Sequence, residues 1–256
     1  MPGTVLITGA SSGIGLELAR ECTRHGHGLV LVARRADRLE EAAAELRERV
    51  QVEVVVSDLS ERNACQALYD RLDEREIEVD YLVNNAGFGL YGPFVEGDAA
   101  RQQEMIALNI AALTQLTRLF AADMKERRRG HVLNLASTAA FQPGPMMAVY
   151  FATKAYVLHF SEAIDNELKG TGVGVTALCP GSTESEFAET AQADRSFVFT
   201  MRTLPTSADV ARYGYRVMMG KKRVAVHGLL NKLLVQAVRL TPRNLVTAIA
   251  RRMMAD

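Results

Sequence analysis

Short apolar runs alternate with helical patterns along most of this chain, and no other feature restricts its possible folds as strongly. The runs are nearly continuous in valine, leucine and isoleucine, and they lie at 4–7, 29–33, 52–56, 79–83, 131–135, 173–178 and 223–226. Strands covered on both faces have this composition. Helical patterns lie between them, at 13–25, 36–49, 60–75, 98–126, 149–169 and 206–219. The alternation predicts a doubly wound α/β fold, in which a parallel sheet of about seven strands carries helices on both faces.

The composition is typical of one large domain. With 256 residues and 48% hydrophobic content, the chain can bury a sizeable core, and it lies at the upper end of the usual size of a domain. No internal repeat, low-complexity tract or linker divides it. We therefore predict a single domain over residues 1–256, with residues 228–256 as a helical C-terminal extension.

Cysteine usage and the N-terminal sequence exclude several classes of protein. Cys22, Cys65 and Cys179 are odd in number and far apart, without a CxxC pair or a histidine cluster, which argues against disulfides and a bound metal. The N-terminus lacks the basic segment and apolar run of a secretory signal. No apolar stretch approaches the roughly 18 residues of a membrane span. We expect a cytoplasmic protein without a membrane-spanning helix.

Charge is unevenly distributed, although the formal net charge is zero. Residues 200–256 carry 11 Lys and Arg against two acids, and they end in two amphipathic helical patterns separated by Thr241-Pro242. Such basic helices can lie on a membrane surface, pack across a subunit interface or dock on their own domain. A solvated face that complements the acidic remainder of the chain is the favoured interpretation, and we predict no binding of nucleic acid.

The first strand runs directly into a glycine-rich turn, TGASSGIG at 8–15, and a helix follows at once. Glycine lets the backbone come close to a ligand, and a helix N-terminus offers unpaired N–H groups to a phosphate. The spacing is GxxxGxG and no GK[ST] follows, which argues against a nucleoside triphosphate. A dinucleotide site is favoured over a plain tight turn. The candidate residues are Gly9, Ser11, Ser12, Gly13, Ile14 and Gly15.

The second strand ends in Ala33-Arg34-Arg35, where many dinucleotide folds carry an acid. A carboxylate there binds a ribose 2′-hydroxyl, whereas an arginine accommodates a 2′-phosphate. Alternatively, both arginines open a solvated helix together with Asp37 and Glu40. Together with the glycine turn, Arg34 and Arg35 predict NADP rather than NAD as the cofactor.

Tyr150 and Lys154 lie four residues apart in a helical pattern, so both side chains project from one helical face. A nearby cation favours the phenolate and lowers the pKa of a tyrosine, which would suit the pair for acid/base chemistry. A half-buried aromatic beside a solvated charge is the ordinary alternative. The neighbouring motifs favour the chemical interpretation.

The order of these motifs resembles that of short, single-domain members of the short-chain dehydrogenase/reductase family, from the first strand to about residue 190. The matching residues are the turn at 8–15, Asp58-Leu59, Asn84-Asn85-Ala86-Gly87, Asn109, Ser137, Tyr150, Lys154 and Cys179-Pro180-Gly181. The resemblance implies a Rossmann-type fold, a nicotinamide cofactor and a carbonyl or alcohol substrate. It does not identify that substrate.

The resemblance also implies a role for each matching residue. Tyr150 would be the general acid/base, Ser137 would stabilise the developing oxyanion, and Lys154 would bind the nicotinamide ribose while tuning the tyrosine. Asn109 would position a water in a proton relay. The implied cofactor contacts are Asp58 and Leu59 near adenine, Asn85, Ala86 and Gly87 along the cleft, and Pro180 and Gly181. Thr183, or alternatively Ser185, would hold the nicotinamide carboxamide.

Apolar residues predict the substrate side of the site. Candidate wall residues are Phe88, Leu90, Tyr91, Phe141, Pro143, Met146 and Met147, with Phe187, Phe197 and Phe199 from segment 184–204. Such a lining suits a hydrophobic ketone or aldehyde, although the same residues can simply pack in the core. We expect segment 184–204 to be a mobile cover over the substrate.

Assembly and activity leave alternatives. The resemblance implies a homodimer or homotetramer that associates through the helices at 98–126 and 149–169. Met105, Leu108, Ala112 and Leu116 suit such an interface, but they can equally face the sheet. The leading hypothesis is an NADPH-dependent carbonyl reductase that also works as an alcohol dehydrogenase. The alternative is an NADP-binding redox sensor with little turnover, which would have no need of the tyrosine.

Overall fold

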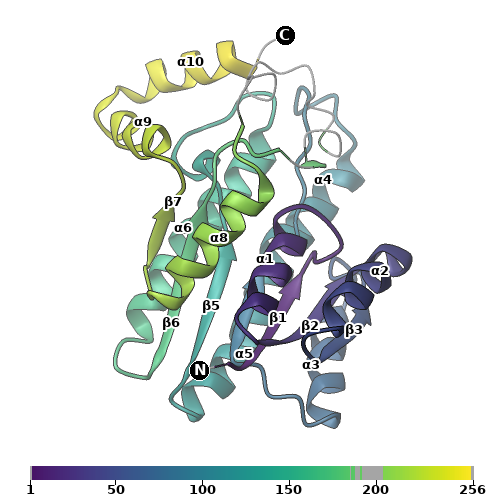
Figure 1. Cartoon of the computed structure of the whole chain (residues 1–256). Helices are drawn as coiled ribbons and strands as arrows, with labels where there is room; N and C mark the ends of the chain where they lie inside the picture. The colour runs from purple at the N-terminus through teal and green to yellow at the C-terminus, as the bar shows by residue number, and fades with distance from the viewer. Residues whose placement is uncertain (1, 185, 188–190, 192–203, 255–256) are drawn as a thin grey trace.

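A computed structural model describes residues 2–184, 186–187, 191 and 204–254 of the chain, and it has the predicted doubly wound α/β architecture (Figure 1). The strands are β1 (Thr4–Thr8), β2 (Gly28–Ala33), β3 (Val52–Val56), β4 (Tyr81–Asn84), β5 (Gly130–Leu135), β6 (Val173–Cys179) and β7 (Val224–Val226). All seven are parallel and follow the order β3-β2-β1-β4-β5-β6-β7. The order reverses beside β1, so the strand ends of β1 and β4 open a crevice where ligands bind in such sheets.

Helices cover both faces of the sheet, which explains why its strands are apolar on both sides. In Figure 1, α1 (Gly13–Arg24) and α8 (Ser207–Met219) lie in front of the sheet. With α2 (Ala36–Arg47) they enclose one buried core. On the other face, α3 (Ala64–Glu74), α5 (Leu113–Glu126) and α6 (Ala148–Glu167) enclose the second. The ends of the strands, rather than their faces, are therefore left for a ligand.

The pattern at 98–126 forms one helix of 28 residues, in which a π-helical segment separates two α-helical parts. It comprises α4 (Ala99–Ile106), a π-helical segment η1 (Ala107–Ala112) and α5. By length and composition this helix could cross a membrane, contrary to the expectation that none would. Half of its most apolar stretch is buried in the molecule, however, so packing on the sheet accounts for its composition.

The proposed interface residues of this helix belong to the core. Met105, Leu108, Ala112 and Leu116 are all buried against the sheet within the one chain. Of the two interpretations of these residues, the structure supports the one in which they face the sheet. A subunit interface on this helix would need other side chains.

The start of α3 differs from the sequence prediction. The helical pattern at 60–75 places the start of this helix at Ser60, but the helix begins at Ala64, after Asn63 in a left-handed conformation. The Ser60 hydroxyl instead donates to Asp58 at 2.6 Å, and the Ser60 amide donates to the same oxygen at 3.0 Å. The serine therefore stabilises the loop after β3, because its short side chain hydrogen-bonds to a nearby carboxylate instead of capping a helix.

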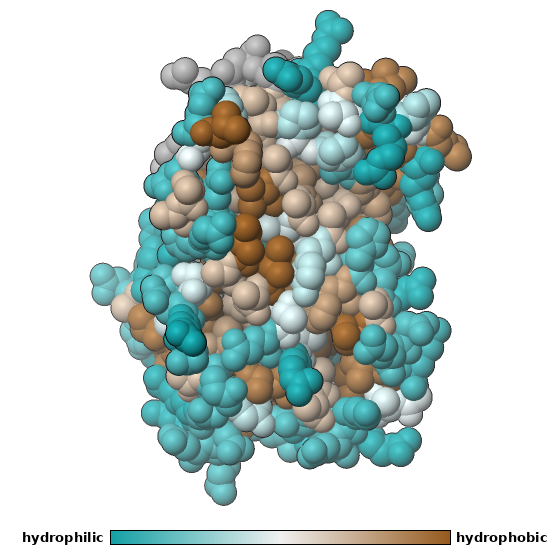
Figure 2. Space-filling model, turned by 180° about the vertical axis from the view of Figure 1, so that it is seen from behind, coloured by the Kyte–Doolittle hydropathy of each residue, from teal (hydrophilic) through white to brown (hydrophobic). Residues whose placement is uncertain are grey.

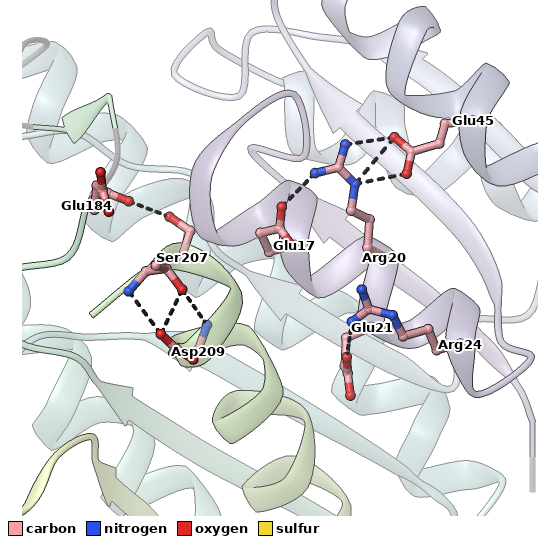
Figure 3. A network of polar contacts seen from close by, with 9 residues as sticks. Glu17, Arg20, Glu21, Arg24, Glu45, Glu184, Ser207 and Asp209 are labelled. Carbon is pink, nitrogen blue, oxygen red and sulfur yellow. Dashed lines mark hydrogen bonds and ion pairs between the residues drawn. The ribbon is translucent and has the colours of Figure 1, made fainter. Parts of the chain in front are cut away.

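Polar contacts tie the front helices to their neighbours (Figure 3). Arg20 of α1 pairs with Glu17 at 2.6 Å and with Glu45 of α2 at 2.7 Å. Near the start of α8, the Ser207 hydroxyl donates to the Glu184 carbonyl at 2.9 Å. Exposed ion pairs of this kind contribute little stability, on the order of 1 kcal/mol or less each. Their main effect here is to hold α1 against α2, and the start of α8 against the residues after β6.

The C-terminal extension forms the two helices that the sequence predicted. They are α9 (Leu229–Leu240) and α10 (Arg243–Met254), and the chain turns between them at Thr241-Pro242. In Figure 1 both lie at one end of the molecule, beyond β7. A short 3-10 segment, η2 (Thr138–Phe141), follows β5 and contacts α9.

Candidate active site

The glycine-rich turn lies where β1 meets α1, and close packing explains two of its glycines. Gly9 has φ +66°, and a Cβ there would lie 2.8 Å from the Asn85 amide nitrogen. A Cβ on Gly15 would overlap the Gly9 carbonyl oxygen. Only glycine permits this approach of the turn, the helix and the end of β4. Ser12 precedes α1 in an extended conformation and makes no side-chain cap, which leaves the helix N-terminus open.

Thr8 and Asn85 join β1 to β4 at this point. The Thr8 hydroxyl accepts the backbone N–H groups of Asn85 and Ala86, both at 3.0 Å. The Asn85 side chain donates to the carbonyls of Thr8 and Gly9 at 2.9 and 3.1 Å. These bonds satisfy the polar groups at the two strand ends and hold the residues after β4 beside the glycine turn.

A cavity of about 340 Å³ opens along these strand ends. Twelve of the predicted cofactor residues line it: Gly9, Ser11, Ser12, Gly13, Ile14, Arg34, Arg35, Asp58, Leu59, Asn85, Ala86 and Gly87. Leu135, Phe187 and Phe88 line it as well. The cavity thus begins at the open N-terminus of α1 and continues toward the end of β5, where Ser137 follows.

Arg34 and Arg35 line the cavity and pair with carboxylates, but not with Asp37 or Glu40. The Arg34 guanidinium donates to Asp58 at 3.2 Å and to Glu104 at 2.9 Å. Burial lowers the pKa of Arg34, but the bonds to these two carboxylates outweigh it and raise the pKa overall. Arg34 is thus a fully charged group at the edge of the cavity.

Arg35 connects the glycine turn to a more distant acid. Its guanidinium donates to the hydroxyls of Ser11 and Ser12 at 3.3 and 2.8 Å, and to Glu186 at 3.0 Å. Arg38 of α2 contacts the same glutamate. The sequence analysis missed Glu104 and Glu186, because they lie 70 and 151 residues from the arginines they meet, and no local pattern predicts such contacts.

Ser137, Tyr150 and Lys154 come together beyond the cavity. Ser137 follows β5 and starts η2, where its hydroxyl accepts the Ala139 N–H at 3.1 Å and donates to the Pro180 carbonyl at 3.4 Å. Tyr150 is 9% exposed, and Lys154 is 6% exposed. The Lys154 ammonium donates to the Leu135 carbonyl at 2.7 Å and lies 5.8 Å from the centre of the tyrosine ring.

The pKa values of this pair contradict the sequence prediction. Burial raises the pKa of Tyr150 to about 12, and a hydrogen bond with Ser137 counteracts only part of that rise. Burial also lowers the pKa of Lys154 to about 8. The prediction considered the attraction between phenolate and ammonium but not the cost of removing both charges from water, which is larger here. In the protein alone Tyr150 is therefore protonated at neutral pH.

Asn109 lies in the π-helical segment and is buried. Its amide oxygen accepts the Phe88 N–H at 3.1 Å, and its amide nitrogen donates to the Phe88 carbonyl at 3.0 Å and to the Thr153 hydroxyl at 3.1 Å. Asn109 thus holds the loop after β4 against α6. Its partner on that helix, Thr153, directly precedes Lys154. π-Helical segments often occur at functional sites.

The residues after β6 lie beside Ser137 rather than along the cavity. The Pro180 carbonyl accepts the Thr138 N–H at 2.8 Å, which holds this loop against η2. Thr183 is buried, and its hydroxyl donates to the Gly181 carbonyl at 3.0 Å. Ser185, the alternative to Thr183, lies outside the described residues, as do Phe197 and Phe199. Most of segment 184–204 is likewise not described, so its predicted mobility stays a prediction.

Several predicted wall residues pack around the tyrosine. Phe88 and Met147 share its buried cluster, and Leu90, Tyr91, Met146 and Phe187 pack against that cluster. The Phe187 ring lies 5.1 Å from that of Tyr150, measured between centroids. Phe141 packs instead with the cluster around Ala136 and Val157. The surroundings of Tyr150 are therefore strongly apolar.

The cavity fits a dinucleotide with a 2′-phosphate. Its lining combines an open helix N-terminus with two arginines at the end of the second strand, and these groups suit phosphates. The cavity also extends from the arginines to Leu135, whose carbonyl accepts the Lys154 ammonium. No cluster of His, Cys, Asp or Glu that could hold a metal ion occurs within the described ranges.

Comparisons with known proteins agree with this geometry. Residues 3–196 match the family model of the short chain dehydrogenases. Sulfoacetaldehyde reductase 2 of Chromohalobacter salexigens is 41% identical over 189 residues, which make up 73% of this chain and 75% of that protein.

Solved structures extend the similarity over nearly the whole chain. A short-chain dehydrogenase from Sphingobium yanoikuyae in complex with NADPH has a TM-score of 0.83 and 34% identity, and the match covers 94% of both chains. A bulky-bulky ketone specific alcohol dehydrogenase from Comamonas testosteroni has a TM-score of 0.79 and 31% identity, with 94% of this chain and 92% of that one covered. With its family match, its parallel sheet and a cavity suited to NADP, this chain belongs to the short-chain dehydrogenases, oxidoreductases that act on CH–OH groups.

Proposed function

We propose that this protein reduces the carbonyl group of a hydrophobic ketone or aldehyde with NADPH, and that the reaction is reversible. One observation carries the proposal: a buried tyrosine lies beside a serine hydroxyl just beyond the end of a cavity suited to the cofactor. The reaction needs a hydride and a proton. Bound NADPH supplies the hydride, so this chain must supply the proton and stabilise the oxygen that receives it.

Tyr150 is the proposed proton donor, and its raised pKa suits the direction of reduction. Because its pKa is about 12, the phenol keeps its proton at neutral pH until negative charge develops on the substrate oxygen. As a donor, the Ser137 hydroxyl makes a long contact of 3.4 Å with the Pro180 carbonyl, so its hydrogen can turn toward the same oxygen. Lys154 holds its ammonium within reach of both the tyrosine and the cleft, where we propose that it binds the nicotinamide ribose.

The remaining site residues are proposed to bind and position. Arg34 and Arg35 would receive the 2′-phosphate, and the open N-terminus of α1 would receive the pyrophosphate. Asp58 and Leu59 would border adenine, and Asn85 to Gly87 the cleft. Pro180, Gly181 and Thr183 would border the nicotinamide. Asn109 positions the loop at Phe88, and through Thr153 it supports the helix that carries Lys154.

The apolar surroundings of Tyr150 support a hydrophobic substrate. Phe88, Met147 and Phe187 offer no charge to a polar ligand, and a methionine adapts to substrates of varied shape. The related alcohol dehydrogenase from Comamonas testosteroni is bulky-bulky ketone specific. The redox-sensor alternative is not favoured, since Ser137, Tyr150 and Lys154 form a complete acid/base arrangement.

The test is a panel of ketones of graded size, assayed with NADPH and with NADH. We expect turnover with apolar ketones and a preference for NADPH. Tyr150→Phe should lower turnover by about 100-fold or more, because it removes the general acid. Tyr156→Phe is the matched control, since this tyrosine lies on the same helix but is 37% exposed. Full activity of Tyr150→Phe would refute the mechanism.

Assembly, location and domain organisation follow from the same interpretation. We propose one domain over residues 1–256, a cytoplasmic protein, and a homodimer or homotetramer. The back face in Figure 2 shows apolar brown surface beside polar surface. On α6, Tyr156 is partly exposed and stacks on Phe160 with ring centroids 5.6 Å apart. Analytical ultracentrifugation of the wild type and of Tyr156→Lys would test whether this part of α6 is an interface.

A further inference from the structure

Helix α9 presents an apolar face to solvent. Leu229 and Leu240 at its two ends are 74% and 89% exposed, and Leu230, Leu233 and Leu234 between them are each more than half exposed. At about 100° per residue these leucines lie within one arc of the helix. The opposite side of the helix, with the buried Val235, packs on the domain. The exposed arc is therefore additional to the side that anchors α9.

Helix α10 repeats this arrangement. Val246, Ala250 and Met254 are buried and form its inner side. Leu245, Ile249 and Met253 lie next to one another on the outer side and are 52%, 49% and 41% exposed. We call the exposed leucines of α9 together with these three residues the C-terminal apolar face. In Figure 2, brown surface lies beside teal surface at the end of the molecule where Figure 1 places α9 and α10.

Every charged side chain of α9 and α10 is basic. Residues 228–254 contain Lys232, Arg239, Arg243, Arg251 and Arg252 but no aspartate or glutamate. All five basic residues are exposed. Basic residues that border an exposed leucine surface are typical of helices that lie in the interface of an anionic membrane, with the apolar side roughly 5–10 Å deep.

The inner sides of the two helices rest on the catalytic region. Asn231 of α9 packs on Gly181, where an added Cβ would lie 2.6 Å from the Asn231 amide nitrogen. At the end of α10, the Met254 carbonyl accepts the Tyr91 hydroxyl at 2.5 Å. Met254 also shares the buried cluster of Phe88 and Tyr150. The C-terminal apolar face is thus the outer surface of a layer whose inner surface adjoins the substrate side of the site.

We propose that α9 and α10 dock this protein on the surface of an anionic lipid bilayer and thereby bring the catalytic region next to the membrane. Its substrates would then include lipophilic carbonyl compounds that partition into the bilayer. This second statement rests on the proposed reductase function, whereas the docking does not.

A second copy of the chain fits this face less well than lipid does. In a two-fold contact the same patch lies on both sides, so the five positive charges of each copy would be brought together at one interface. No acid within residues 228–254 could compensate them. Anionic headgroups compensate them directly, at about 1 kcal/mol for each basic residue near the surface.

The test is flotation of the purified full-length protein with vesicles of phosphatidylcholine alone and with vesicles that also contain phosphatidylglycerol. Wild type should float with the anionic vesicles at low salt and less at high salt. Arg239→Gln, Arg251→Gln and Arg252→Gln combined should lower the partition coefficient by about 100-fold. Leu229→Ser, Leu233→Ser and Leu240→Ser combined should abolish flotation, and their exposure allows the chain to fold. Phe94→Ser with Val95→Ser is the control, because both residues are exposed but lie outside this face.

Failure of the wild type to float with anionic vesicles at low salt would overturn the proposal. The proposal would also be overturned if the leucine variant still floated. The same holds if the leucine substitutions changed only the oligomeric state in ultracentrifugation. Tyr150→Phe should float like the wild type, which separates docking from catalysis. With a lipophilic ketone dissolved in the vesicles, the leucine variant should lose turnover, while its turnover of a water-soluble ketone stays unchanged. An equal loss for both ketones would contradict delivery from the membrane.

Discussion

The two ends of the cleft use charge in different ways. At the arginine end, Arg34 and Arg35 are 49% and 45% exposed in their side chains, and they pair with carboxylates that solvent can replace. At the tyrosine end, Tyr150 and Lys154 are buried, and desolvation moves both pKa values away from their usual range. Exposed charges attract and exchange partners at little cost, whereas buried ones tune proton transfer. The predictions below test this contrast from the largest effect to the smallest.

Ser137→Ala should lower turnover by about 100-fold, because one donor to the developing oxyanion is lost in a buried site. The Michaelis constant for NADPH should change little. Ser137→Thr keeps a hydroxyl at this position and should retain much more activity than Ser137→Ala. Steady-state kinetics with one ketone decides this, and equal activity of Ser137→Ala and wild type would remove the serine from the mechanism.

Lys154 should make stability depend on pH in alkaline solution. Its pKa is lowered from 10.5 to about 8 in the folded chain, so between these values the unfolded chain binds more protons. Below pH 8 the buried ammonium lowers the free energy of unfolding, and this loss is therefore recovered as pH rises. Relative to Lys154→Met, the wild type should gain about 2 kcal/mol between roughly pH 7.5 and 9.5.

Urea unfolding of the two proteins at both pH values measures this gain. The comparison with Lys154→Met matters because burial raises the pKa of the thiols of Cys22 and Cys65, which acts in the opposite direction in both proteins. A difference between the two proteins that does not vary with pH would show that Lys154 keeps its usual pKa.

Arg34→Ala and Arg35→Ala should each weaken NADPH binding by about tenfold and leave NADH nearly unchanged, since each removes a partner of the 2′-phosphate. High salt should reduce both effects because the arginines are exposed. Arg38→Ala is the control, as Arg38 meets Glu186 but does not line the cavity. Titration of fluorescence with both cofactors measures the effect. Equal weakening of NADPH and NADH would refute the 2′-phosphate role.

Glu104→Gln should produce the smallest effect. It removes one carboxylate from Arg34, so NADPH should bind about two- to threefold more tightly, and the free energy of unfolding should change by less than about 1 kcal/mol. Glu40→Gln, which removes an exposed partner of Arg47 instead, should change neither quantity. Weaker binding of NADPH by Glu104→Gln would show that this acid positions Arg34 rather than competing for it.

The sequence by itself determined the elements and their order. Apolar runs, glycines and helical periodicity are local patterns, so they predicted the parallel sheet and the glycine turn at Gly9. Arg34 and Arg35 predicted NADP, and the similar dehydrogenase from Sphingobium yanoikuyae was solved in complex with NADPH. Local patterns predicted the ends of the elements less reliably. One helical pattern begins at Ser60, but that residue lies in the loop after β3 and bonds to Asp58. Local patterns also could not reveal the π-helical geometry at Asn109, since six residues of π-helix have no side-chain pattern that distinguishes them from an α-helix.

Only the tertiary structure decided what depends on burial and on distant contacts. It brought Glu104 and Glu186 to the arginines, placed Met105 and Leu116 in the core, and reversed the predicted shift in the pKa of Tyr150. Spacing along a helix shows which side chains are neighbours. The free energy of a charge depends on how much water and how many partners surround it, and the folded chain alone sets both.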